Sequence, residues 1–234
     1  MPQIFVPKRF NGPPDTANGG YVAGLIAGEM RKAGMGGTIE VSLRAPPPVE
    51  AAMDLVIADG ACECRHGETV VGAARRVEAL GAVPAAPSLD VASRGRDNFP
   101  PVADHAFPYC FVCGPSRTHD GLCIFTGRPH GYDGVTDVWT PDADYADDSG
   151  RVHEEVLWAA LDCPGAFAIG FQERPMVLGR IRGEVLRRPE AGAPLIVAAW
   201  HLYDDGRKHG AASALFTANG ELLAQTEQLW IELK

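Results

Sequence analysis

The chain has 234 residues, of which 46% are hydrophobic and 22% are charged, so we expect a globular protein rather than a disordered one. Lys and Arg number 21 against 30 Asp and Glu, and the net charge of −9 argues against nucleic-acid binding. No apolar run reaches the length of a membrane span, and the N-terminus lacks the apolar core of a signal peptide. We therefore expect a cytoplasmic protein with no membrane partner and with its six cysteines reduced.

The composition changes between residues 81 and 105, where Pro, Ala, Gly and Ser dominate and no periodicity is visible. Such a segment is typical of a connection between structural units. We therefore predict a first unit over residues 1–80, a linker over 81–105 and a second unit over 106–234.

Both units show the same order of elements. In the first unit, residues 18–33 are a helix candidate whose core, residues 21–27, is apolar on nearly every face, which predicts a buried helix. Residues 38–44 then alternate strictly between apolar and polar side chains, as a half-buried strand does. The second unit has a helix candidate over residues 152–171. Further strands are predicted at residues 51–61, 69–79, 177–186, 195–203, 211–217 and 222–233.

Short sequence signals link these elements into antiparallel meanders. Asp205–Gly206 and Asn219–Gly220 are hairpin turns between predicted strands. Leu43-Arg44-Ala45-Pro46 follows the first strand after one helix, and Leu186-Arg187-Arg188-Pro189 follows the first strand after the other. The pattern predicts an α+β fold in which each unit wraps an antiparallel sheet around one helix, and it does not fit a parallel βαβ fold.

Three motifs carry a resemblance to a known family. The run from His153 to Ala168 resembles the central helix of hotdog-fold thioesterases, in which an acidic residue follows nine positions after a His; here that residue is Asp162. Cys110-Phe-Val-Cys-Gly-Pro115, with Asp120-Gly-Leu122, is similar to the opening of phenylacetate-pathway-type hotdog thioesterases. Asn18-Gly-Gly-Tyr21 resembles the helix start of the same superfamily. The resemblance covers nearly the whole chain outside the linker, and it implies a double hotdog.

Each unit departs from the family pattern in a different way. Glu154 and Glu155 stand in the second unit where the family has Gly-Gly, and Ala27 stands in the first unit where the family has the acid. One unit therefore keeps the glycines and the other keeps the carboxylate.

Asp162 follows a stretch of apolar residues that should be buried. A buried carboxylate costs free energy unless it is hydrogen-bonded, so its presence points to a role. One interpretation is a general base, or a nucleophile, that attacks a thioester carbonyl. The other is structural: Pro164 could break the helix, and Asp162 could then cap a second helical segment.

The helix start at Asn18, Gly19, Gly20 and Tyr21 offers backbone N–H groups that suit a developing oxyanion. The alternative is that Asn18 is an ordinary N-cap and that the glycines allow tight helix packing. A composite site, with these first-unit amides facing Asp162, would use each partial pattern once.

Several other polar residues each allow a functional and a structural interpretation. His153 could orient water or could simply cap its helix. Arg180, Arg182, Arg187 and Arg188 could bind the phosphates of coenzyme A, or they could form a solvated strand face. Gln225, Thr226 and Gln228 loosely match the Thr and Gln that position water in some double-hotdog acyl-CoA thioesterases, although a polar edge-strand face also explains them.

Cys110, Cys113, His119 and Cys123 have ligand types and spacing near those of a zinc knuckle. The acidic chain lacks a nucleic-acid surface, and the family resemblance accounts for the Cys-x-x-Cys-Gly-Pro run as a turn leading into a strand. We therefore expect no metal in this segment. No nucleotide-binding loop or nucleophile elbow is present, so we expect no cofactor.

The sequence and the resemblance together lead to one main hypothesis and two alternatives. The main hypothesis is a hydrolase of acyl thioesters, either acyl-CoA or an acyl-carrier thioester, with Asp162 as the base. The alternatives are a non-catalytic acyl-ligand binder and a hotdog hydratase or dehydratase, which would need a His facing the acid. Association of double-hotdog chains into a homo-oligomer is compatible with each.

Overall fold

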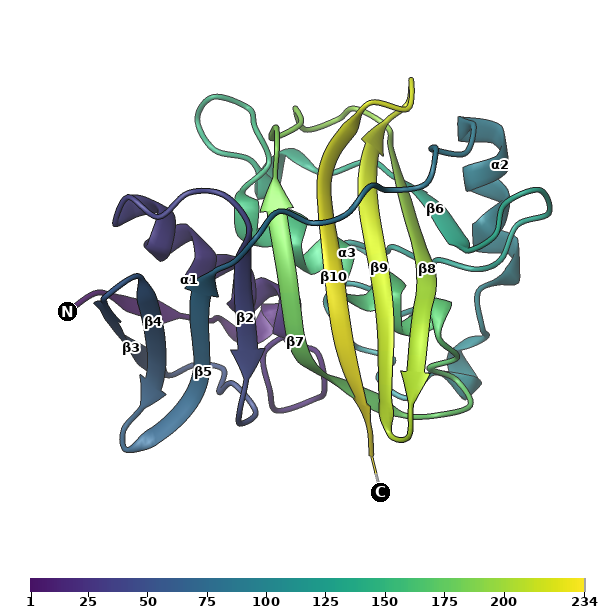
Figure 1. The fold of residues 1–234 in the computed structure, drawn as a ribbon. Helices are drawn as coiled ribbons and strands as arrows, with labels where there is room; N and C mark the ends of the chain where they lie inside the picture. The colour runs from purple at the N-terminus through teal and green to yellow at the C-terminus, as the bar shows by residue number, and fades with distance from the viewer. Residues whose placement is uncertain (234) are drawn as a thin grey trace.

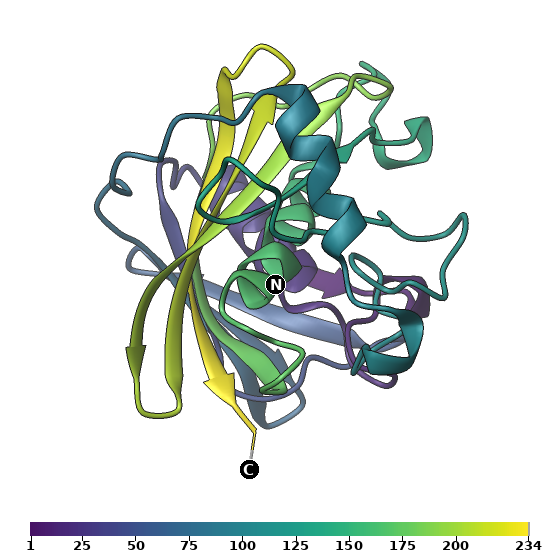
Figure 2. The same ribbon diagram turned by 90° about the vertical axis from the view of Figure 1, so that its right-hand side faces the viewer.

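The computed structural model describes residues 1–233. Ten strands form one sheet in the order β1-β3-β4-β5-β2-β7-β10-β9-β8-β6, and neighbouring strands are antiparallel. The sheet is strongly curved, and the two long helices lie on its concave side (Figures 1 and 2).

The two units contribute equivalent elements. The first unit supplies one long helix and five strands: α1 (Gly19–Lys32), β1 (Gln3–Phe5), β2 (Ile39–Leu43), β3 (Ala52–Ala58), β4 (Ala61–His66) and β5 (Thr69–Arg76). The second unit supplies the same set: α3 (Glu154–Ala168), β6 (Val135–Trp139), β7 (Met176–Val185), β8 (Leu195–Asp205), β9 (Lys208–Thr217) and β10 (Leu222–Glu232).

The strand order is the same when read outward from the middle of the sheet. β2 of the first unit pairs with β7 of the second, with Ile39 opposite Gly183 and Ser42 opposite Arg180. From this junction each unit runs outward to a short edge strand, β1 or β6. The junction therefore joins two copies of one motif into a continuous sheet.

The two long helices cross at close range because glycines stand at the contact. A Cβ built on Gly20 would lie 2.5 Å from Asp162 Cβ, and one on Gly24 would lie 2.5 Å from Glu155 Cα. Four residues apart, these glycines share one face of α1. The start of α1 thereby meets the C-terminal half of α3, and the two helices run antiparallel.

Several predicted boundaries shift in the structure. α3 ends at Ala168 rather than at residue 171, and it continues through Pro164. β4 was not predicted as a separate strand, and β8 and β9 are longer than expected. The predicted hairpin turns are present, and Gly206 and Gly220 adopt φ of +58° and +83°. These positive φ values are the reason that glycine suits both turns.

The predicted linker contains helical turns. Ser88 caps α2 (Leu89–Ser93) by accepting a hydrogen bond from Val91 N, and the 3-10 turn η2 (Arg94–Asn98) follows. Ala92 is fully buried, and its carbonyl accepts a hydrogen bond from Thr136 Oγ1. This part of the linker therefore packs on β6 of the second unit. Among residues 1–233, no helix has the length and apolar character of a membrane span.

Candidate functional site

An apolar cavity of about 540 Å³ lies where the two units meet. The start of α1, the 43–47 segment, the C-terminal half of α3, and the ends of β7 and β10 line it. Phe107, Phe167 and Phe171 form an aromatic wall. Among the described residues that line the cavity, Asp162 and Arg44 are the charged ones. An apolar cavity with a few convergent polar groups is the usual form of a small-molecule site.

Asp162 lines this cavity and is 2% exposed. Its Oδ2 accepts hydrogen bonds from Asn18 Nδ2 and from the Gly20 backbone N–H, each at 2.9 Å. Its Oδ1 has no hydrogen-bond partner within residues 1–233. One carboxylate oxygen is therefore held by the start of α1 in the other unit, and the other makes no hydrogen bond to the described residues.

Burial raises the pKa of the Asp162 carboxyl to about 7. The hydrogen bond from Gly20 N–H acts in the opposite direction, the negative charge of a Cys110 thiolate raises the pKa further, and the Asn18 amide lowers it. Such a value suits proton transfer near neutral pH, because a base is most effective when its pKa is close to the working pH.

The start of α1 is organised around Asp162. The Asn18 side chain accepts a hydrogen bond from Tyr21 N–H at 2.9 Å, while its amide nitrogen donates to Asp162. The amides of Gly20 and Tyr21, which were predicted to form an oxyanion hole, thus already donate to Asp162 and Asn18. Gly19 lines the cavity.

A buried polar network on β9 and β10 fixes the helix turn that carries Asp162. Ser213 Oγ donates to the Leu161 carbonyl at 2.5 Å, and Gln228 Nε2 donates to the same carbonyl. Gln228 also bonds Ser213 and Thr226, each at 2.9 Å. Gln228 can approach because residue 165 is glycine: a Cβ there would overlap Gln228 Oε1. Thr226 and Gln228 therefore hold α3 in place, and neither lines the cavity.

His153 and the four arginines lie away from the cavity. His153 is the N-cap of α3, makes no side-chain capping bond and is half-buried. Arg180 and Arg182 pair with Glu40, and Arg182 also reaches Glu227. Arg187 and Arg188 pair with Glu221 and Asp147 at 2.6 and 2.7 Å. The structure does not bring these arginines to the site.

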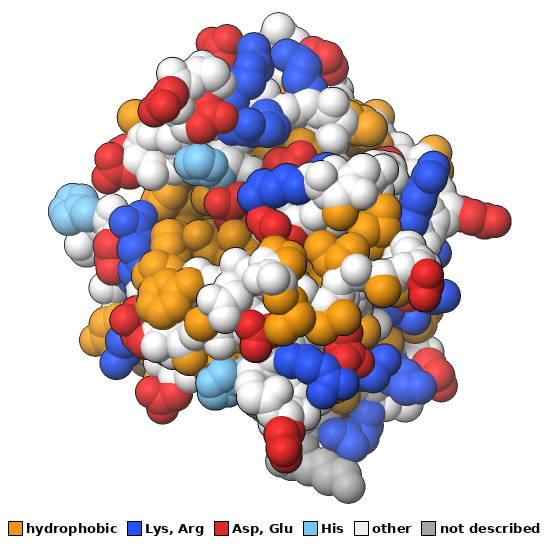
Figure 3. Space-filling view, turned by 90° about the vertical axis from the view of Figure 1, so that its left-hand side faces the viewer, with side chains coloured by type: hydrophobic (Ala, Val, Ile, Leu, Met, Phe, Trp, Pro, Cys, Tyr) orange, Lys and Arg blue, Asp and Glu red, His pale blue; other side chains and the backbone are white. Residues whose placement is uncertain are grey.

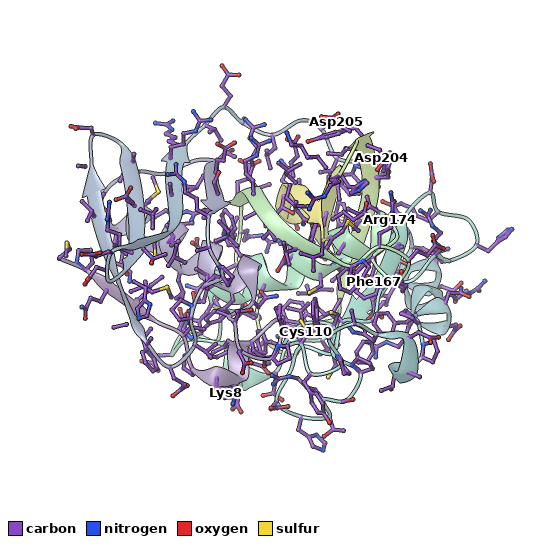
Figure 4. All side chains as sticks on the ribbon, turned by 90° about the horizontal axis from the view of Figure 1, so that it is seen from below. Lys8, Cys110, Phe167, Arg174, Asp204 and Asp205 are labelled. Carbon is purple, nitrogen blue, oxygen red and sulfur yellow. The ribbon has the colours of Figure 1, made fainter. Side chains whose placement is uncertain are left out.

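The cysteines that lie together are not the set that the zinc-knuckle spacing suggested. Cys110 and Cys113 lie with Cys163 of α3, and the three Sγ atoms are within 4.8 Å of one another. Cys123 is apart from this group and donates to the Arg117 carbonyl, and His119 is not a member of it. Figure 4 labels Cys110 and Phe167, two of the residues that line the cavity. Hydrogen bonding by Cys113 and Cys163 lowers the pKa of the Cys110 thiol.

A second, wider hollow of about 1230 Å³ includes Arg128, Arg174, His201 and Asp204. Its two arginines donate to the carbonyls of Ala168 and Ile169, at the C-terminal end of α3. That is a normal way to satisfy the last carbonyls of a helix. Although this hollow is larger, its cations are already engaged, and we take the apolar cavity at Asp162 as the candidate site.

No protein-family model matches the sequence, and no curated protein matches it by sequence. Solved structures do match. A putative thioesterase II from Thermobifida fusca superposes with a TM-score of 0.65 at 13% identity, over 99% of this chain and 92% of that one. A protein with a hotdog fold from Alicyclobacillus acidocaldarius gives 0.62 at 15% identity, over 99% and 92%. An acyl-CoA thioesterase II from Mycobacterium marinum gives 0.56 at 12%, over 99% and 92%.

These full-length similarities confirm the predicted fold: the chain is an α+β double hotdog. At such identities the similarity establishes the fold and leaves the chemistry to the residues of the site.

Proposed function

We propose that this chain hydrolyses an acyl thioester whose acyl group occupies the apolar cavity. The observation that carries the proposal is Asp162: a buried carboxylate that lines an apolar cavity, with one oxygen held by Asn18 and Gly20 and the other without a partner within residues 1–233. The names of the structurally similar thioesterases agree with it.

In this mechanism a water molecule attacks the thioester carbonyl carbon while Asp162 Oδ1 takes its proton. The carbon–sulfur bond of the resulting tetrahedral species then breaks. The carboxylic acid is released, and Asp162 returns the proton to the leaving thiolate. Asn18 and Gly20 keep Oδ2 in place, so that the proton moves to and from a fixed Oδ1.

The test is hydrolysis of a panel of acyl-CoA esters by the parent protein and by Asp162→Asn. The Asn variant keeps the shape but not the base, so turnover should fall about a hundred-fold or more while acyl-CoA still binds. Asp137→Asn is a matched control, because Asp137 is a buried carboxylate of the same unit that pairs with Arg96 outside the cavity. Full activity in Asp162→Asn would overturn the proposed role.

A second candidate function is an acyl-ligand binder without catalysis. It is favoured by one observation: the Gly20 and Tyr21 amides are already hydrogen-bonded, which removes two donors that an oxyanion would need. Tight acyl-CoA binding with no hydrolysis in the parent protein would select it. A hydratase receives no such support, since no histidine is among the described residues lining the cavity.

A further inference from the structure

We propose that Cys110, Cys113 and Cys163 form a zinc site whose fourth coordination position faces the cavity. The proposal does not depend on the hydrolysis proposed above. It rests on the arrangement of three sulfur atoms that the chain brings together from two distant segments: a turn after Phe107 and helix α3.

The sulfur spacing fits tetrahedral coordination. Cys110 Sγ and Cys163 Sγ are 3.7 Å apart, and all three Sγ atoms lie within 4.8 Å of one another. Two sulfurs bound to one tetrahedral zinc at about 2.3 Å each are separated by about 3.8 Å. Binding therefore requires only small side-chain adjustments.

The backbone around the cluster also holds the sulfurs together. Cys110 and Cys113 lie in a tight turn, in which Gly114 N–H donates to the Cys110 carbonyl at 2.9 Å. A Cβ on Gly114 would lie 2.5 Å from Cys110 N, so only glycine allows the turn to close. This is the geometry of a Cys-x-x-Cys metal ligand pair, with α3 supplying the third sulfur.

The surroundings favour a cation. The three cysteines are at most 7% exposed, and among the described residues that line the cavity Arg44 is the positively charged one. Without a metal, burial favours neutral thiols, and binding of a cation would displace their protons and leave three thiolate ligands. Zn²⁺ prefers thiolate ligands and would balance their negative charge.

Asn18 supplies an outer-shell donor that the cluster would use. Its Nδ2 lies 3.8 Å from Cys163 Sγ and 2.9 Å from Asp162 Oδ2. Hydrogen-bond donors to ligand atoms are a regular part of zinc sites. Because all three cysteines line the cavity, a water molecule or a ligand oxygen can complete the coordination from that side.

The experiment measures metal content in protein purified without a metal-affinity tag. Elemental analysis should find about one zinc per chain, and the content should fall about tenfold or more in Cys163→Ser and in Cys113→Ser. Cys123→Ser is the matched control, because Cys123 comes from the same segment but lies outside the cluster; its zinc content should not change. Circular dichroism verifies that each variant is folded.

A second measurement does not depend on the variants. Replacing zinc by Co²⁺ in the parent protein should give the intense thiolate-to-cobalt absorption of a sulfur-rich tetrahedral site. A parent protein that contains less than about a tenth of an equivalent of zinc, and whose melting temperature does not rise when zinc is added, would overturn the proposal. Zinc kept in Cys163→Ser but lost in Cys123→Ser and His119→Ala would also overturn the proposal. The metal would then be bound by the segment from Cys110 to Cys123, without a ligand from α3.

Discussion

The two ends of the contact between α1 and α3 are equivalent positions in the two units, yet they are built differently. At one end, Asp162 of α3 meets the start of α1 beside the cavity. At the other, Ala27 of α1 stands at the equivalent position, fully buried, and Glu154 at the start of α3 pairs with Arg31 at 2.9 Å. Ala27 shows that the fold does not need a carboxylate at this position, so the cost of burying Asp162 points to function.

The largest expected effect is a difference in how stability depends on pH. The native pKa of Asp162 is about 7, above its ordinary value of 3.8, so between these values the native state holds a proton that the unfolded state has lost. The contribution of Asp162 therefore weakens as pH rises from about 4 to about 7, by up to about 4 kcal/mol. Asp162→Asn lacks this titration, as Ala27 does.

Urea unfolding of the parent protein and Asp162→Asn, across this pH range and with a chelator present, measures the difference. The two stabilities should diverge as pH rises, with Asp162→Asn the more stable near neutral pH. If the stabilities of both proteins depend on pH in the same way, the pKa of the Asp162 carboxyl is not raised. The Asp162 and Ala27 ends of the helix contact then do not differ in titration.

Alanine substitutions at two glycines of α1 should have opposite effects on stability. A Cβ at Gly20 would lie 2.6 Å from the Trp158 carbonyl oxygen, which is backbone of α3, whereas nothing lies within 4 Å of one at Gly28. Gly20→Ala should therefore lower the free energy of unfolding by about 3 kcal/mol through overpacking. Gly28→Ala should raise it by about 0.5–1 kcal/mol through helix propensity. Equal effects in denaturant unfolding would show that the crossing is not closely packed at Gly20.

The smallest expected effect concerns Arg44 and Arg187, which occupy the same position in the two Leu-Arg-x-Pro segments. Arg44 lines the cavity, whereas its counterpart Arg187 is paired with Glu221 on the surface. If Arg44 meets a phosphate of coenzyme A, Arg44→Ala should raise KM for acyl-CoA about fivefold and leave KM for an acyl-pantetheine unchanged. Arg187→Ala should alter neither value. If Arg44→Ala changes KM equally for acyl-CoA and acyl-pantetheine, or if Arg187→Ala changes it as much as Arg44→Ala does, Arg44 does not bind a phosphate of the substrate.

The sequence predicted the main helices and strands because their apolar residues recur at the positions that are buried in the fold. The apolar core of residues 18–33 and the mostly apolar surface of residues 152–171 marked the two central helices, and Asp162 stood out as polar within an apolar stretch. By contrast, α2 has only five residues, in a segment rich in Pro and Ala, where no periodicity can develop. The three-residue strand β1 also gave no pattern of its own.

The contacts that define the site depend on tertiary structure. Asn18 and Asp162 are 144 residues apart, and they were expected to meet only because each unit keeps a different part of the family pattern. Cys110 and Cys163 are 53 residues apart, and no local spacing reveals that pair. The arginines of β7 were predicted as phosphate ligands because the acids facing them were unknown. Glu40 stands on β2, which becomes a neighbour of β7 only through the central junction of the sheet.

Joining both units in one chain has a consequence for how such a site can change over time. In a dimer of identical units, a substitution at the helix crossing would appear twice, so a buried carboxylate would have to be tolerated at both places. In this chain it appears once, and the other end of the helix contact carries an alanine and a partly buried ion pair instead. One half can therefore accumulate changes that stabilise the molecule, while the other retains a group that stability alone would discard. The face seen in Figure 3 carries acidic and basic side chains interspersed around areas of hydrophobic ones.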